Sequence, residues 1–456
     1  MLTDTIAAIA TPLGEGGLAV IRISGRDALA VADRTFIPQG RSSQKPSLAP
    51  SHTVHYGHVI RHGLVVDEVL ATVLRAPRTF TREDTVEISC HGGLLATKAV
   101  LDAALANGAR LAAPGEFTKR AFLNGRLDLA QAEAVADLIH ARTDLALAAA
   151  NEQLAGKLSH RIGELRDQLL RTLAHVEAHL DFPEEDIAPD TRDALLDRLA
   201  SSAVFIEQLL LTAHEGQLLR RGIRAAIIGR PNAGKSSLLN QLLGRDRAIV
   251  SPVAGTTRDT IEETASIRGI PVIFIDTAGL RESADTLELE GIRRSRVALA
   301  QAEIVLHVLD CSESLSAYDR QCLDDFAGRR RILVLNKSDR PRQLDLPDSL
   351  SIPVQNVSCT TGDGIEALKD AIKQIVWAGE IRAEMLEVMI NSRHQDALRR
   401  AHQATTRAHA ALAGNLTLEL AAMELRIAVN AVGEVVGKTS TEDLLDSIFS
   451  QFCIGK

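Results

Sequence analysis

The order of apolar and polar positions divides the 456-residue chain into three textures. Up to about residue 120, residues 94–106 have helical spacing, and short apolar runs separated by turns predict strands at 18–23, 65–73 and 85–89. From 121 to 217, and again from 379 to 456, apolar residues recur every three or four positions, which predicts helices. Residues 218–378 alternate strand-like and helical runs. This order predicts a helical domain interrupted by an inserted α/β domain.

One strand-loop-helix junction carries a phosphate-binding motif. Residues 229–236 read Gly-Arg-Pro-Asn-Ala-Gly-Lys-Ser and directly follow an apolar run. The two glycines let backbone amides face phosphates, Lys235 would reach the phosphates, and the Ser236 hydroxyl would ligate Mg²⁺. A chance match in a chain of this length has a probability of about one in a hundred, so a plain glycine turn is a weak alternative. The expected nucleotide contacts are Asn232, Ala233, Gly234, Lys235, Ser236 and Ser237.

Three further motifs follow in the order that a guanine-nucleotide site requires, each after an apolar run. Asp276 would hold the Mg²⁺ shell, and Asp339 would accept two hydrogen bonds from guanine that adenine cannot offer. An unpaired buried polar group costs about 1–3 kcal/mol, so GTP is the expected nucleotide. The motifs are Asp276-Thr277-Ala278-Gly279, Asn336-Lys337-Ser338-Asp339 and Ser358-Cys359-Thr360.

The group that orients the attacking water does not follow from these motifs. Leu280 stands where small signalling GTPases carry a glutamine, and leucine has no polar group for that work. Another side chain, an ion or a partner must help hydrolysis. Thr257 lies in a loop that resembles the one that closes over Mg²⁺. The candidate side chains are Arg281, Glu282, Asp285, Glu288 and Glu290, although a solvated surface helix explains this acidic stretch equally well.

Composition is that of a globular protein, with 45% hydrophobic and 24% charged residues. No apolar run reaches membrane-spanning length, and no secretory signal opens the chain. The five cysteines form no Cys-x-x-Cys pair, which argues against zinc and disulfides and favours a reducing cytoplasm.

A basic segment at 393–409 carries four arginines and three histidines against one acid, Asp396. At helical spacing it predicts either a phosphate-contacting stripe or a solvated helix face. The net charge of −8 favours the second interpretation.

Both ends of the chain carry specific signatures. The N-terminal part contains Arg22-Ile23-Ser24-Gly25, His91-Gly92-Gly93 and the run Pro114-Gly115-Glu116-Phe117-Thr118-Lys119-Arg120-Ala121-Phe122-Leu123-Asn124. The tail reads Phe452-Cys453-Ile454-Gly455-Lys456. With these motifs the chain resembles the MnmE (TrmE) family of tRNA-modification GTPases over nearly its whole length.

The resemblance implies a multidomain α/β plus all-α protein. An N-terminal α/β folate-binding-like and dimerisation domain is expected at 1–120, a helical domain at 121–217 and 379–456, and an inserted P-loop GTPase (Ras-like) domain at 218–378. Family members are homodimers that hold 5-formyltetrahydrofolate. With an FAD-dependent partner, MnmG (GidA), they add an aminomethyl-type group to carbon 5 of the wobble uridine of certain tRNAs, which requires GTP hydrolysis.

The family resemblance also implies roles for individual residues. Glu288 matches the glutamate that orients the attacking water, and Mg²⁺ is assigned to Ser236 and Thr257. Potassium, which would neutralise developing charge at the phosphates, is assigned to Asn232, Ser251, Val253 and Thr256. The loop contacts to GTP are Ser251, Pro252, Val253, Ala254, Gly255, Thr256 and Thr257. The folate contacts are Arg22, Glu87, Arg126 and Lys456, with Arg126 where many relatives have lysine.

Two alternatives stay open. Cys453 fits either a reactive thiol in the folate pocket or a plain buried cysteine, and it fits a prenylation box poorly. The function is expected to be that of a tRNA-modifying GTPase. A regulatory or ribosome-assembly GTPase of the same superfamily is the second candidate, and a structural dimer scaffold with vestigial nucleotide binding is the third.

Overall fold

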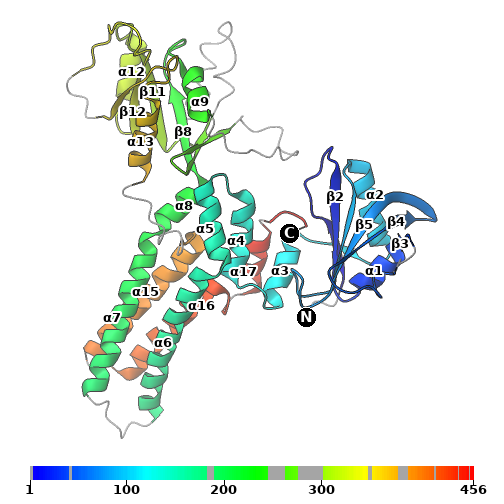
Figure 1. The fold of residues 1–456 in the computed structure, drawn as a ribbon. Coiled ribbons are helices and arrows are strands. Elements are labelled where there is room, and N and C mark those ends of the chain that lie inside the picture. The colour runs from blue at the N-terminus through cyan, green and yellow to red at the C-terminus, as the bar shows by residue number, and fades with distance from the viewer. Residues whose placement is uncertain are drawn as a thin grey trace.

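The computed structural model describes residues 4–40, 44–181, 189–244, 262–275, 301–347, 352–377, 389–414, 417–439, 441–450 and 452–455. Figure 1 shows three bodies: an N-terminal sheet domain, a long helical body, and a second sheet domain at one end of that body. The multidomain arrangement expected from the sequence is therefore confirmed.

The N-terminal domain is a seven-stranded sheet with the strand order β3-β4-β5-β6-β2-β1-β7, antiparallel except where β1 meets β7. Helices α1 (Ala28–Thr35) and α2 (Leu94–Ala106) pack on one face, where Ile21 and Ile88 lie opposite each other in the core. The expected strands and helix of this region are thus present. The strands are β1 Ile6–Ile9, β2 Leu18–Ser24, β3 Phe36–Pro38, β4 Thr53–Arg61, β5 Leu64–Leu74, β6 Thr85–His91 and β7 Arg110–Leu111.

The other face of this sheet is not covered by α1 or α2. Side chains alternate between the two faces of a strand, so Tyr56 on β4 lies on the same face as Leu70, its neighbour on β5. Both are almost half exposed, at 46% and 45%, and Leu18 on β2 is 72% exposed. Arg22 and Glu87 lie on this same open face by register.

The helical body is assembled from both sides of the inserted domain. Leu169 on α6 and Leu199 on α7 share one core with Leu398 on α15 and Leu425 on α16. The four long helices lie side by side in Figure 1. The helices are α3 Glu116–Leu123, α4 Leu129–His140, α5 Asp144–Leu154, α6 Lys157–Asp181, α7 Pro189–Leu211, α8 Ala213–Arg221, α15 Ser392–Ala413, α16 Leu418–Val436 and α17 Glu442–Phe449.

The inserted domain is a six-stranded sheet with the order β13-β12-β11-β8-β10-β9, parallel except at β9. Its strands β8, β11 and β12 are almost continuously buried, as expected for parallel strands covered on both faces. The elements are β8 Ile223–Ile228, α9 Lys235–Leu243, β9 Glu263–Ile267, β10 Ile270–Phe274, β11 Ile304–Asp310, α12 Ala317–Asp325, β12 Arg331–Asn336, β13 Val354–Asn356 and α13 Ile365–Val376.

The inserted domain meets the helical body at a compact joint. Within the helical body, Arg220 at the end of α8, the helix that leads into the inserted domain, forms an ion pair of 2.6 Å with Asp137 on α4. Arg142 donates a hydrogen bond of 3.0 Å to Thr264 on β9. The expected domain limits at 120 and 217 fall inside α3 and α8, and they stay predictions. Among the described residues, no helix is both long and apolar enough to cross a membrane.

Candidate functional site

The nucleotide motifs lie at one edge of the parallel sheet. The chain leaves β8 for β9 and β10 on one side and continues to β11 on the other, so the order of strands reverses beside β8. Ligands of open α/β sheets bind outside the carboxyl ends of strands at such a point. The loop 229–236 follows β8, the Asn336–Asp339 motif begins at the end of β12, and Ser358 follows β13.

Close packing explains the glycines of the phosphate loop. Gly229 has a φ of 144°, and a Cβ there would lie 2.2 Å from the Val308 carbonyl oxygen on β11. Gly234 has a φ of 97°, and a Cβ there would lie 2.0 Å from Nδ2 of Asn336. Neither position tolerates a side chain, so the loop lies directly against the neighbouring strand ends.

Lys235 lies against the loop that carries it. Its ammonium donates hydrogen bonds to the carbonyl oxygens of Gly229, at 2.9 Å, and Arg230, at 2.7 Å. Burial lowers the pKa of this ammonium. Both partners are neutral carbonyl groups that leave the positive charge of the ammonium uncompensated, so an anion at this loop would be a favoured partner for Lys235.

Asn336 connects the phosphate loop to the base-recognition loops. Its Nδ2 donates to the Ala233 carbonyl at 2.8 Å, and its Oδ1 accepts from the Cys359 amide at 3.2 Å. Asp339 accepts a bond of 2.6 Å from Ser358 Oγ, which lowers the pKa of this exposed carboxyl. The carboxylate is therefore ionised and has lone pairs left for a ligand. In this way the structure brings three of the expected motifs together.

Several predicted residues lie outside the described ranges, so their placement stays a prediction. Asp276, Lys456 and the water-orienting candidate Glu288 are among them. So are the remaining contacts expected around GTP, Mg²⁺ and K⁺: Ser251, Pro252, Val253, Ala254, Gly255, Thr256, Thr257, Thr277, Ala278 and Gly279.

A second group of predicted residues meets on the open face of the N-terminal sheet. Arg22 and Glu87 are register partners on β2 and β6, and Arg22 Nε donates to Glu87 Oε1 at 2.8 Å. The carbon of the Arg22 guanidinium lies 5.6 Å from the ring centre of Phe117 and 5.9 Å from that of Phe80. Arg126 lies 5.0 Å from the same Phe80 ring. These three predicted residues thus lie close together, with Arg22 and Arg126 against the same Phe80 ring, and they form the N-terminal site.

The charge of this N-terminal site favours an anion. Burial lowers the pKa of Arg126, and the nearby Arg82 lowers it further. Arg126 donates a hydrogen bond of 2.8 Å to the Thr79 carbonyl. Within the part of the chain that the structure describes, no carboxylate forms an ion pair with Arg126, so a carboxylate of a ligand would relieve its unpaired charge.

The C-terminal tail lies beside Arg22 of this site. Arg22 donates to the Gly455 carbonyl at 3.4 Å, and a Cβ on Gly455 would lie 2.2 Å from the Ile9 carbonyl oxygen on β1. Cys453 is exposed, so its interpretation as a plain buried cysteine is wrong; Phe452 instead supplies the buried anchor of the tail. The reactive-thiol interpretation stays a prediction.

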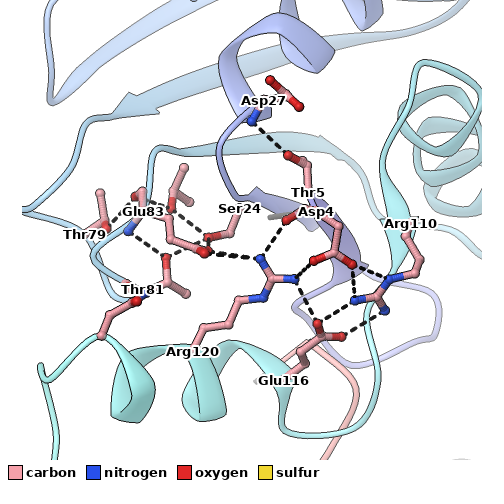
Figure 2. A network of polar contacts seen from close by, with 12 residues as sticks. Asp4, Thr5, Ser24, Asp27, Thr79, Thr81, Glu83, Arg110, Glu116 and Arg120 are labelled. Atoms are coloured by element: carbon pink, nitrogen blue, oxygen red, sulfur yellow. Dashed lines mark hydrogen bonds and ion pairs between the residues drawn. The ribbon is translucent and has the colours of Figure 1, made fainter. Parts of the chain in front are cut away.

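The N-terminal domain also contains a polar network around Arg120 that the sequence did not assign to any role (Figure 2). Arg120 is 1% exposed and contacts three carboxylates, those of Asp4, Glu83 and Glu116. The Glu116–Arg120 spacing of four residues in a helical segment was a possible signal. Phe80 was another, because aromatic residues make up only 3% of the chain and this one lies in a polar loop.

The basic segment at 393–409 forms α15 but no open phosphate stripe. Arg393 pairs with Glu133 on α4 at 2.8 Å, and Arg400 pairs with Glu434 on α16 at 2.5 Å. Arg407 likewise pairs with Glu424 at 2.8 Å. Acids of neighbouring helices therefore neutralise these cations, and the sequence missed them because they lie far along the chain.

Known proteins resemble the chain over its whole length. Residues 5–126 match the family profile of the GTP-binding protein TrmE N-terminus, and residues 129–453 match that of the MnmE helical domain. The tRNA modification GTPase MnmE of Listeria welshimeri is 46% identical over 458 aligned positions, which cover 99% of each chain. The protein of the same name from Geobacillus kaustophilus is 47% identical over 460 positions, again 99% of each chain. The solved G domain of the FeoB iron transporter of T. maritima is 27% identical and covers 34% of this chain and 98% of its own, with a TM-score of 0.26. From the two profile matches and the full-length identity, the chain belongs to the MnmE family of tRNA modification GTPases.

Proposed function

We propose that this protein is a K⁺-dependent GTPase that, with the FAD-dependent MnmG, adds an aminomethyl-type group to carbon 5 of the wobble uridine of certain tRNAs. As a member of its family it hydrolyses GTP in tRNA modification. The observation that carries the proposal is the bond of 2.8 Å from Asn336 to Ala233, which joins the phosphate loop to the base-recognition loops in a chain with both MnmE-specific domains.

In the nucleotide site of the inserted GTPase domain, called the G site, each proposed role fits the residue type. Asp339 would accept the two guanine hydrogen bonds, and Lys235 would bind the phosphates and stabilise the transition state. Ser236 and Thr257 would ligate Mg²⁺, and Glu288 would orient the attacking water. Bound K⁺ would neutralise charge that develops on the phosphates, held by Asn232, Ser251, Val253 and Thr256.

The N-terminal pocket is proposed to bind 5-formyltetrahydrofolate as the source of the one-carbon unit. The carboxylate of Glu87 suits the adjacent N–H donors of the pterin ring, while Arg22, Arg126 and Lys456 suit the negatively charged glutamate tail. Supporting this, Arg22 and Glu87 are paired on adjacent strands, and Arg126 shares the Phe80 ring with Arg22.

A homodimer is proposed through the open face of the N-terminal sheet. Exposed Leu18, Tyr56 and Leu70 lie on this face, and burying them would remove apolar surface from water. Because Arg22 and Glu87 lie on the same face, the dimer interface and the ligand-binding site would lie next to each other. tRNA and MnmG are the proposed partners, and the cytoplasm is the proposed location.

The experiment that tests this function measures three activities of the purified full-length protein. We expect 5-formyltetrahydrofolate to bind in calorimetry. We expect GTP turnover to rise at least about tenfold when K⁺ replaces Na⁺. We also expect wobble-uridine modification to disappear from the tRNA nucleosides of a deletion strain and to return with the wild-type gene. Turnover without folate binding and without a change in tRNA would instead favour a regulatory or ribosome-assembly GTPase.

A further inference from the structure

The loop between β5 and β6 lies against the cations of the N-terminal site, whose proposed ligand pocket it would line. Phe80 in this loop lies beneath the guanidinium groups of both Arg22 and Arg126. The neighbouring Thr79 carbonyl accepts a hydrogen bond of 2.8 Å from Arg126. The position of both cations therefore depends on where this loop lies.

Glu83 lies near the end of that loop and makes several of its internal hydrogen bonds. Its carbonyl oxygen accepts from the hydroxyls of Thr79, at 2.7 Å, and Thr85, at 3.2 Å, and its amide donates to Thr81 Oγ1 at 3.3 Å. The loop is thus closed on itself, while the Glu83 carboxylate points toward Ser24 and Arg120 (Figure 2). Ser24 Oγ lies 2.9 Å from this carboxylate.

Arg120 links this loop to two other segments. On α3, its guanidinium donates to Glu83 Oε1 at 3.2 Å, to Asp4 Oδ1 at 2.8 Å and to Glu116 Oε1 at 2.9 Å. Arg110 also binds Asp4 and Glu116, but its side chain is 48% exposed and no contact joins it to Glu83 among the described residues. The two arginines share two carboxylate partners but differ in burial and in their connection to the loop.

We propose that Arg120 is a positioning residue for the pocket: through Glu83 it fixes the loop that carries Thr79 and Phe80, and so orients Arg22 and Arg126 for an anionic ligand. The inference rests on the proposed binding of a tetrahydrofolate there. Guanidinium groups bind carboxylates with directional, often bidentate bonds, so small displacements of the floor weaken binding.

Substitutions of two carboxylates distinguish a positioning role from a role in stability alone. Glu116 accepts bonds from Arg110 at 2.7 Å, from Arg120, and from the Ala113 amide at 2.8 Å, and it is 7% exposed. It stabilises the start of α3, and among the described residues no hydrogen bond or ion pair joins it to the loop. Glu83 has fewer ion pairs and sits in the loop. The substitution Glu116→Gln should therefore cost more stability, and Glu83→Gln should cost more affinity.

The experiment compares Glu83→Gln and Glu116→Gln in the full-length protein. Calorimetry should show 5-formyltetrahydrofolate binding about tenfold weaker in Glu83→Gln, equivalent to about 1.4 kcal/mol, and nearly unchanged in Glu116→Gln. The thermal transition should fall further in Glu116→Gln. GTP turnover should match the wild type in both variants. If a single variant showed the larger loss of both folate affinity and thermal stability, the proposal would be overturned.

A second pair addresses the arginine itself. Arg120→Lys keeps a cation but has one donor centre in place of a fork, so it should weaken binding as Glu83→Gln does. Arg110→Lys is the matched control and should leave affinity unchanged. Equal losses in both would contradict the proposal.

A readout without ligand separates this inference from the function on which it rests. Hydrogen exchange should accelerate across residues 79–85 in Glu83→Gln, and at the start of α3 in Glu116→Gln. If the wild type does not bind the folate, the proposed function is wrong, and the exchange pattern alone decides whether Arg120 fixes the loop. Unchanged exchange at 79–85 would overturn the inference even if the wild type binds.

Discussion

Different kinds of interaction hold the two candidate sites together. In the G domain, neutral bonds between side chain and main chain tie the loops together, from Asn336 to Ala233 and from Gln241 to Cys359. In the N-terminal domain, Arg22 and Glu87 stand on paired strands. In the same domain, the buried Arg120 forms ion pairs with three carboxylates (Figure 2).

This difference separates two ways of building a binding site. The G site combines close backbone packing at its glycines with two ion pairs to buried acids, Lys337 with Asp310 and Arg230 with Asp319, while its Asp339 carboxyl is exposed. The N-terminal site uses buried ion pairs, whose removal leaves uncompensated charge and affects stability as well as binding. Variants of the exposed Asp339 in the first site should therefore change affinity alone, whereas some variants of the second should change both affinity and stability.

The largest effect is expected in the G site. Asp339→Asn removes the carboxylate that would accept two guanine hydrogen bonds, so the KM for GTP should rise roughly a hundredfold or more. Thermal unfolding should stay unchanged. Xanthosine triphosphate is the control, because its ring carries a carbonyl where guanine has an amine, and the new amide can donate to it. An unchanged KM for GTP would contradict the assignment of Asp339.

A smaller effect is expected for Arg126 in the N-terminal pocket. Arg126→Gln removes a cation with a lowered pKa and no described acidic partner, so 5-formyltetrahydrofolate should bind about tenfold or more weakly. Arg82→Gln is the matched control, because Arg82 is exposed and donates to the Asn124 carbonyl. Equal losses in calorimetry would mean that overall charge, and not the position of Arg126, attracts the ligand.

A still smaller effect is expected for the tail. Gly455→Ala places a Cβ against the Ile9 carbonyl at a φ of 98°, which should displace the tail and weaken folate binding about fivefold. Gly63→Ala is the control, because Gly63 has a φ of 78° but a Cβ there would have no neighbour within 4 Å. Comparable losses of affinity in both variants would show that backbone strain alone, and not docking of the tail, is responsible.

The smallest effect concerns pH. Burial raises the pKa of Glu116, but bonds from Arg110, the Ala113 amide and Arg120 outweigh it and leave the pKa lowered. A carboxyl with a lowered folded pKa stabilises the fold above its unfolded pKa of about 4.3, and this contribution is lost as the pH falls toward the folded value. The ratio of exchange rates of α3 amides between Glu116→Gln and wild type should therefore be largest at pH 7 and shrink toward pH 3. A constant ratio would contradict the role of the charge.

Sequence reasoning worked where chemistry is local. The strands before the nucleotide motifs and the glycines at 229 and 234 follow from hydrophobic periodicity and from the demands of a tight loop. The helical body also followed, because helical periodicity on both sides of an α/β region predicts two halves that pack together around an insertion.

The sequence could not supply contacts between distant segments. The acids that neutralise Arg393 and Arg400 lie on α4 and α16, and no local pattern relates them. The same holds for Glu83 and Arg120, which are joined only after β6 and α3 have packed. Arg22, Glu87 and Arg126 came from family resemblance, and their common pocket became evident from the strand register and the Phe80 ring.

The division of the helical core has a consequence for synthesis on the ribosome. The first half of that core ends near Ala213, and its partners begin near Ile390. At about 5–20 residues per second, the nascent α6 and α7 wait roughly 10–35 s before α15 can cover them. A chain that stops after Arg221 should therefore expose an apolar helical surface, and light scattering should detect its aggregation. In the full-length chain, α15 is synthesised after the G domain and covers this surface.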